Sequence, residues 1–236
     1  MTEWQKFWNS FPLSAGRSEH LKQVGKTVQG QPISGLQFRQ IHSDIAQHLA
    51  LSSDDVVLDL CCGNGLITKE IAQISQSVVG VDFSHPLINI AGQDHQPDNV
   101  RYHHLSVLDL TPEAIGPTEP FTKVYMYEAL QDFGKGDLVT ILATILELSA
   151  DDVVILLGSV LDKSRFWHFY NTPQRRFDFF KRKLLGGDTL GTWWDKRFIQ
   201  ETCNRMGWQS DFLPQHTMLH TAHYRFDVRI RRALKS

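Results

Sequence analysis

Apolar positions in this chain alternate between short continuous runs and longer stretches with helical spacing. Steps of three and four residues predict a first helix through Phe38, Ile41, Ile45 and Leu49. After a polar turn at 52–55, residues 56–60 read VVLDL, a short run with β-branched residues that predicts a buried strand. The helical spacing then returns at Ile67, Ile71 and Ile74.

Strands and helices go on alternating through the middle of the chain. Further strands are predicted at 78–81, 100–106, 123–127 and 153–158, and a helix at 138–148. Strands that alternate with helices favour a parallel sheet covered on both faces. After Gly158 the pattern changes to a helix at 195–206 and strands at 209–213 and 219–230. The sequence therefore predicts a three-layer α/β sandwich with a mostly parallel, seven-stranded sheet and an antiparallel C-terminal edge hairpin.

Two segments fall outside this alternation, although 236 residues suit a single domain over 1–236. Residues 1–35 are predicted to form an N-terminal cap, with one helix face that packs as core or lid through Trp4, Phe7, Trp8 and Phe11. Residues 161–195 are predicted to form a lid or substrate insertion. Positions 163–183 carry seven basic residues, one acid and seven aromatic residues. Either the aromatic side chains pack inward beneath a solvated basic face, or the positive charge attracts an anionic substrate.

Composition narrows the class of protein. The formal net charge of −2 and the isoelectric point near 6.6 argue against a nucleic-acid partner, which requires a basic face. Three cysteines do not make a disulfide scaffold. The N-terminus lacks the features of a signal peptide, and no apolar stretch approaches the roughly 18 residues of a membrane span. We expect a cytoplasmic, soluble protein without a membrane partner.

The strand at 56–60 leads directly into a glycine-containing turn, Cys61-Cys62-Gly63-Asn64-Gly65. In open α/β sheets, ligands bind at this carboxyl end of the strands, where glycines allow close approach of the backbone. The dinucleotide pattern G-x-G-x-x-G is incomplete because its third position is Thr68. Both cysteines are interpreted as small turn residues.

Two acidic residues accompany this turn. Asp59 lies four positions before Gly63, where its carboxylate could receive the ammonium of an amino-acid moiety. Asp82 ends the next predicted strand, 19 positions after Gly63, where it could accept both hydroxyls of a ribose. Together they favour a nucleoside that carries an amino acid.

These residues resemble two motifs of the class I, Rossmann-like, S-adenosylmethionine-dependent methyltransferases of the small-molecule type. The D-x-x-x-G-x-G pattern of Asp59, Gly63 and Gly65 is similar to motif I, and the segment that ends in Asp82, Phe83 and Ser84 is similar to motif II. The resemblance implies a Rossmann-like sheet and S-adenosylmethionine as cofactor.

The resemblance also implies where each part of the cofactor lies. The methionine part would contact the motif I residues, Asp82 would hold the ribose, and Phe83 would pack on the adenine. Ser106 and Val107 would touch the adenine, with serine in place of the usual aspartate, and Tyr127 and Glu128 would line the site near the sulfonium. The full set of implied cofactor-binding residues is Asp59, Cys61, Gly63, Asn64, Gly65, Asp82, Phe83, Ser84, Ser106, Val107, Tyr127 and Glu128.

Other motifs are weaker. Gly25-Lys26-Thr27 resembles the end of a phosphate-binding loop, but such a loop requires a glycine at position 20, which holds His20. The four-residue step from His216 to His220 would bring two histidines together only on a helix, whereas this segment is predicted to be extended, so no metal site is predicted. The segment after the fourth strand lacks an N-P-P-Y-type motif, and no aspartate cluster suits magnesium. Both observations favour a metal-free enzyme that acts on a small molecule.

The expected reaction is methyl transfer to an oxygen or nitrogen atom of a small metabolite. The basic insertion favours an anionic or carrier-bound acceptor, such as a sugar, a nucleotide-linked sugar or a natural-product intermediate. Asp132 and His223 are the candidate catalytic residues that would take a proton from the acceptor. Two alternatives stay open: a non-catalytic cofactor-binding protein on the same fold, and a nucleotide-dependent oxidoreductase.

Overall fold

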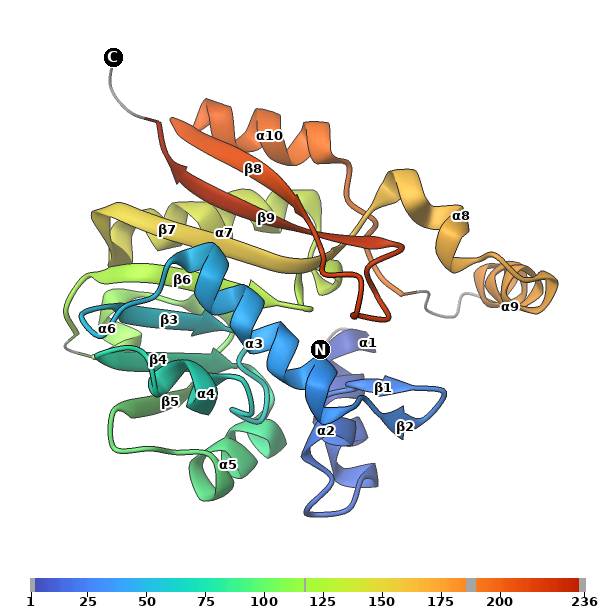
Figure 1. The fold of residues 1–236 in the computed structure, drawn as a ribbon, viewed down its shortest axis with the longest axis horizontal. Helices are drawn as coiled ribbons and strands as arrows, with labels where there is room; N and C mark the ends of the chain where they lie inside the picture. The colour runs from blue at the N-terminus through green and yellow to red at the C-terminus, as the bar shows by residue number, and fades with distance from the viewer. Residues whose placement is uncertain (1–2, 117, 186–189, 234–236) are drawn as a thin grey trace.

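The computed structural model describes residues 3–116, 118–185 and 190–233, and its central feature is a seven-stranded sheet (Figure 1). The strand order is β5-β4-β3-β6-β7-β9-β8. The five strands from β5 to β7 are parallel, and β9 pairs antiparallel with both β7 and β8. This confirms the predicted mostly parallel sheet with an antiparallel edge hairpin. The strands are β3 Val56–Leu60, β4 Ser77–Asp82, β5 Val100–His104, β6 Phe121–Tyr127, β7 Ser149–Leu161, β8 Trp208–Pro214 and β9 Arg225–Arg232.

Alternation of side chains along the buried strands produces the three layers. On β3, Leu58 packs into one hydrophobic core together with residues of α7 and α10. Its neighbour Val57 points to the other face and packs with residues of α3 and α4. Because both faces are covered, the five residues of β3 are all buried. The helices that accompany the sheet are α3 Gly35–Leu49, α4 Thr68–Ala72, α5 His85–Asp94, α6 Pro112–Ile115, α7 Lys135–Leu148 and α10 Lys196–Arg205.

Several predicted boundaries differ from the structure. The predicted strand at 219–230 is wrong over 219–224, because β9 begins only at Arg225. In the turns before it, the Thr221 hydroxyl donates to Gln215, whose amide donates to Asp227, so buried polar side chains replace strand pairing. The helix after β3 ends at Ala72, which leaves Ile74 39% exposed. Strand β7 extends beyond the predicted 153–158 at both ends.

The segment predicted as an N-terminal cap folds into short elements beside the carboxyl edge of the sheet. Rings at positions 4, 7, 8 and 11 contact one another, and Phe7 stacks on Phe11 at 4.8 Å between ring centroids. The elements are α1 Glu3–Ser10, the 3₁₀ turn η1 Phe11–Ser14, α2 His20–Gln23, β1 Thr27–Val28 and β2 Gln31–Pro32. Residues 1–2 of the predicted cap lie outside the described residues.

The predicted insertion follows β7 and projects from the body as short helical elements (Figure 1). These are η4 Lys163–Arg165, α8 Phe166–Phe169 and α9 Pro173–Leu184. Residues 186–189 of the insertion lie outside the described residues. Among the helices that are described, none is both long and apolar enough to cross a lipid bilayer.

The turn after β3 generates one expectation about stability. Gly65 has φ +76°, and a Cβ there would collide with the hydroxyl of Tyr102, whereas Gly30 has φ +77° with open space around it. An alanine costs about 1–2 kcal/mol in this left-handed backbone, and overpacking adds about 1–3 kcal/mol. We expect Gly65→Ala to lower the free energy of unfolding, measured by urea denaturation, clearly more than Gly30→Ala. Equal losses would show that the Tyr102 contact does not matter.

Candidate functional site

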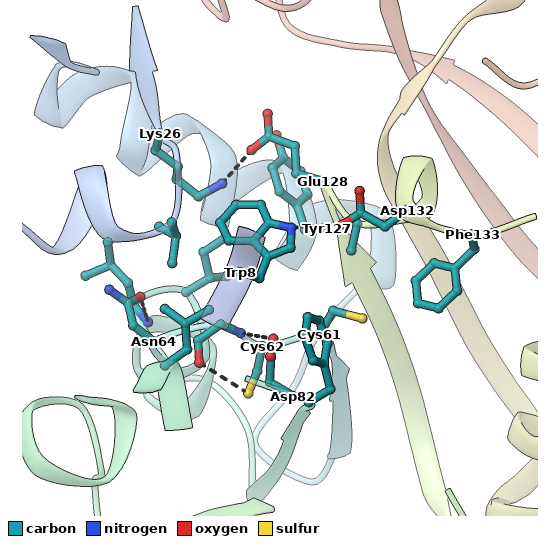
Figure 2. Close-up of a pocket in the computed structure, with 17 residues that line it drawn as sticks. Trp8, Lys26, Cys61, Cys62, Asn64, Asp82, Tyr127, Glu128, Asp132 and Phe133 are labelled. Carbon is teal, nitrogen blue, oxygen red and sulfur yellow. Dashed lines mark hydrogen bonds and ion pairs between the residues drawn. The ribbon is translucent and has the colours of Figure 1, made fainter. Parts of the chain in front are cut away.

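The carboxyl ends of β3 and β6 meet at the point where the chain reverses its direction across the sheet. Strands β4 and β5 continue to one side of β3, and β6 and β7 lie on the other. Open α/β sheets bind ligands at such a switch point. A cavity of about 710 Å³, partly open to solvent, lies here (Figure 2). Predicted site residues in its lining are Cys61, Gly63, Asn64, Asp82, Phe83, Tyr127, Glu128 and Asp132.

The turn after β3 has an unusual backbone that brings its amides to the cavity. Cys61 has φ +59° and Gly63 φ +58°, both in the left-handed region that favours glycine. The Gly63 amide donates to Asp82 Oδ2 at 2.9 Å. Burial raises the pKa of the Cys61 and Cys62 thiols well above their ordinary value. Both cysteines therefore stay protonated, which agrees with their interpretation as small turn residues.

Asp82 is the carboxylate at the wall of the cavity. Its Oδ2 accepts from Gly63, and its Oδ1 accepts from the Ser84 amide at 2.8 Å. A carboxylate oxygen can accept a second hydrogen bond, so both oxygens keep capacity for a ligand. Burial raises the pKa of Asp82 to about 6 despite these two amide bonds. The group is ionised at neutral pH and rigidly oriented.

Asp59 has a supporting position rather than a place in the cavity lining. It is 2% exposed, and its Oδ2 accepts from the Thr68 hydroxyl at 2.6 Å and the Tyr125 hydroxyl at 2.5 Å. Burial raises the pKa of Asp59 to about 7, against the lowering effect of these hydroxyls. Thr68, the residue that interrupts the dinucleotide pattern, thus ties the helix after the turn to the end of β3.

Glu128 is paired with a lysine that the sequence analysis did not assign to the site. Lys26 is 7% exposed, and its Nζ lies 2.7 Å from Glu128 Oε2 and 4.9 Å from the centre of the Tyr127 ring. Burial alone would raise the pKa of Glu128, but the charges of Lys26 and Arg225 lower it to about 2. Glu128 is therefore a fixed anion. Because such a weak base holds a proton poorly, it does not suit proton transfer at neutral pH.

The N-terminal segment closes one side of the cavity through side-chain contacts. The Trp8 indole donates to Asp132 Oδ2 at 3.2 Å, and the Trp8 carbonyl accepts from the Ser84 hydroxyl at 2.8 Å. The side-chain amide of Asn64 donates to the His20 carbonyl and to the Gln23 side chain, each at 3.0 Å. Figure 2 shows Trp8 between Lys26 and Asp132. Helical spacing predicted the face that holds Trp8, but no pattern linked it to residues more than 70 positions away.

Several predicted site residues lie elsewhere. Gly65 and Ser84 support the turn and the start of α5 without lining the cavity. Ser106 caps the 3₁₀ turn η2 Val107–Asp109, and Val107 is buried in the core, so neither reaches the cavity. His223 is exposed, and its carbonyl lies 3.3 Å from His168 Nδ1. Of the two candidate catalytic residues, the structure brings only Asp132 to the cavity.

A second, smaller cavity of about 320 Å³ adjoins the first. Lys26, Tyr127 and Glu128 line both spaces, so that their side chains form the boundary. On its far side it is lined by residues of α3 and of the turns before β9, including His220. Burial lowers the pKa of His220, which favours its neutral form. Among the described residues, no group of three or more His, Cys, Asp or Glu is placed to hold a metal ion.

Comparison with known proteins connects this site to a family. Residues 57–152, which contain the turn, Asp82 and β6, match the family model of the methyltransferase domain. A ubiquinone biosynthesis O-methyltransferase of Albidiferax ferrireducens is 23% identical over 64% of this chain and 57% of its own length. A 23S rRNA (uracil(1939)-C(5))-methyltransferase of Photorhabdus laumondii is 30% identical over 49% of this chain and 26% of its own. The chain thus spans less than two thirds of the length of these relatives.

Solved structures share the whole fold. The magnesium protoporphyrin IX methyltransferase of Synechocystis PCC 6803, solved with bound SAH, superposes with a TM-score of 0.69 at 14% identity over 98% of both chains. A complex of the protein DhpI with SAM has a TM-score of 0.64 at 15% identity, over 98% of this chain and 96% of that one. Residues 57–152 thus match a methyltransferase domain, and the chain shares the Rossmann-like fold of structures solved with S-adenosylmethionine or S-adenosylhomocysteine.

Proposed function

We propose that this protein binds S-adenosylmethionine in the cavity at the switch point and transfers its methyl group to a small metabolite. The observation that carries the proposal is the Asp82 carboxylate, which two backbone amides hold at the cavity wall. A rigid carboxylate with one acceptor site left on each oxygen suits the paired hydroxyls of a ribose. Phe83 lines the same wall and offers an apolar surface for an adenine.

The charges around the cavity suit the other end of the cofactor. Asp82, Glu128 and Asp132 line the space, which favours a ligand with a sulfonium and an ammonium. The methionine part also carries a carboxylate, and Lys26 is the cation in the lining that can receive it. Glu128 lies beside Lys26, so Glu128 can hold the ammonium of the methionine part while Lys26 turns to its carboxylate. These assignments rest on the charges and positions of the side chains.

The cofactor supplies an activated methyl group, so the protein mainly has to align the acceptor and exclude water. Trp8 and the rest of segment 3–34 cover one side of the cavity, and we propose that this segment acts as the cap that excludes water. The acceptor is proposed to enter the cofactor cavity itself, which is partly open and which Asp132 lines.

Asp132 is the proposed proton acceptor. It lines the cofactor cavity, and the Trp8 indole fixes its Oδ2 atom. Glu128 is too weak a base for this role, and His223 lies outside the lining of both cavities. Both oxygen and nitrogen acceptors lose a proton during methylation, so this role does not depend on which atom is methylated.

The first test measures the affinity for S-adenosylhomocysteine as a function of pH by calorimetry. Only ionised Asp82 can accept both ribose hydroxyls, and its pKa is about 6. Affinity should therefore be full above pH 7 and fall as pH drops through 6, by up to about tenfold at pH 5, where about a tenth of the group is ionised. Asp82→Asn should bind more weakly and lose most of this pH dependence. A wild-type affinity that is flat from pH 5 to 8 contradicts the role of Asp82.

The second test separates the two ends of the cofactor. Lys26→Met should lower the affinity for S-adenosylhomocysteine at least about tenfold, because a charge-assisted bond to the carboxylate is lost. Methylthioadenosine lacks the amino-acid part, so its affinity should change little in Lys26→Met but fall in Asp82→Asn. Circular dichroism checks that both variants are folded. An equal loss for both ligands in Lys26→Met would mean that Lys26 does not contact the amino-acid end.

The third test concerns the reaction. Incubation with methyl-labelled S-adenosylmethionine and a metabolite extract should give a labelled product. Asp132→Asn should lower its rate of formation by about 100-fold, the usual contribution of a general base, with S-adenosylhomocysteine binding nearly unchanged. His223→Gln is the matched control and should retain the wild-type rate. Binding of the cofactor without any labelled product would favour the non-catalytic alternative, and binding of NAD alone would favour the oxidoreductase.

A further inference from the structure

The insertion after β7 forms a projecting arm, defined here as residues 163–185, at the far right of Figure 1. None of its residues lines the cofactor cavity or the neighbouring smaller one. No residue of α9 is buried. Of the two alternatives for this segment, inward packing of the aromatic side chains does not hold for Phe177 and Phe180 of α9, which are exposed.

One set of aromatic rings attaches the arm to the body. Phe179 of α9 contacts Tyr170 at 4.8 Å and Phe166 at 5.2 Å between ring centroids. Phe166 contacts Trp193 at 4.9 Å, outside the arm. These contacts explain why Phe179 lies on the inner face of α9. They also determine which face of the helix points outward.

A second set of apolar side chains has no such explanation. Phe177, Phe180 and Leu184 are 62%, 51% and 86% exposed. Their spacing of three and four residues places them on one stripe of the helix. At 100° per residue this stripe lies well away from Phe179. Trp167 of α8 adds a further ring that is 52% exposed. A soluble surface seldom exposes such a row of large apolar groups without a binding partner.

Basic side chains flank the exposed stripe on both sides. By the same helical geometry, Arg176 and Lys183 lie on one side of it and Lys181 on the other. The Arg176 guanidinium also lies 5.4 Å from the centre of the Trp167 ring. Helix α9 carries five basic residues and one acid, although the whole chain has a formal charge of −2. The positive charge of the arm is thus a local feature of this helix.

We propose that the arm docks on an anionic lipid surface, with the stripe of Phe177, Phe180 and Leu184 inserted between headgroups and the flanking lysines and arginines paired with lipid phosphates. Apolar side chains on one face, bordered by long basic ones, are the pattern of helices that lie in the membrane interface. The stripe stands on a projecting helix, which suits a deformable lipid surface better than a folded partner that must offer a matching groove.

This proposal departs from the expectation that the protein has no membrane partner. That expectation rested on the absence of a long apolar span, which excludes crossing a bilayer but not lying on its surface. The proposal does not depend on methyl transfer, because the arm contributes nothing to either cavity. Loss of lipid binding and loss of cofactor binding can therefore be measured separately on the same protein.

The test is co-sedimentation of the full-length protein with vesicles of phosphatidylcholine alone or mixed with phosphatidylglycerol. Wild-type protein should bind the mixed vesicles and not the neutral ones. Arg176→Gln together with Lys183→Gln should weaken binding by roughly fivefold for each charge removed. Phe177→Asn together with Phe180→Asn should weaken it at least about tenfold, because the inserted apolar area is lost.

Helix α3 supplies matched controls. Leu36 is 60% exposed, and Arg39 is also exposed. Leu36→Asn and Arg39→Gln should leave vesicle binding unchanged. All arm variants should bind S-adenosylhomocysteine like the wild type, which shows that they are folded. That control does not require an active enzyme.

Four outcomes would overturn the proposal. Wild-type protein that stays in solution with phosphatidylglycerol vesicles is the first, and arm variants that bind like the wild type are the second. The third is a dimer in light scattering that the arm variants convert to monomers while vesicles remain unbound, which would make the stripe a contact between copies of this chain. Arm-dependent retention on RNA without vesicle binding is the fourth, and would assign the basic residues to nucleic acid.

Discussion

The gathering of carboxylates at one edge of the sheet is the constraint on which the rest of this site depends. Asp59 and Asp82 end neighbouring parallel strands, and Glu128 follows the strand on the other side, so the topology itself brings them together. Burial makes their ionised forms costly. Each is stabilised differently: Asp59 by two hydroxyls, Asp82 by two backbone amides and Glu128 by Lys26. The negative charge that these partners do not neutralise can attract a cationic ligand.

The N-terminal segment is held by Glu128 and by other residues of the loops at the strand ends. Lys26 pairs with Glu128, Trp8 bonds to Asp132 and Ser84, and the Asn64 side chain bonds to the segment around α2. Because each of these polar contacts ends on a residue that follows a sheet strand, the cap and the cavity share a polar network. A ligand that draws Lys26 or Asp132 toward itself would thereby also change how firmly the cap is held. Under the proposed function, cofactor binding and closure of the cavity would be coupled through Lys26 and Asp132.

The strand-end loops and the arm differ in where they place their charged side chains. The strand-end loops gather buried charge around an enclosed space, whereas the arm places charge and apolar surface outward on a helix without buried residues. The arm joins the body through aromatic contacts at its base and leaves the cavity walls to other elements. The proposed lipid-binding surface and the proposed cofactor site are therefore physically separate in this fold.

The sequence by itself determined the sheet and the turn that faces the cofactor. Strand β3 was predicted to the residue, because a run buried on both faces must be continuously apolar, and Gly63 with Asp82 marked the ligand edge because both lie at strand ends. Only the tertiary structure showed that Lys26 and Trp8 belong to the site and that His223, Ser106 and Val107 do not line it. Contacts between residues 26 and 128 or 8 and 132 leave no periodic signal in a single chain. The outward direction of Phe177 and Phe180 was likewise decided by Phe179, which packs on Phe166 and Tyr170 at the base of the arm and turns the rest of the apolar face of α9 to solvent.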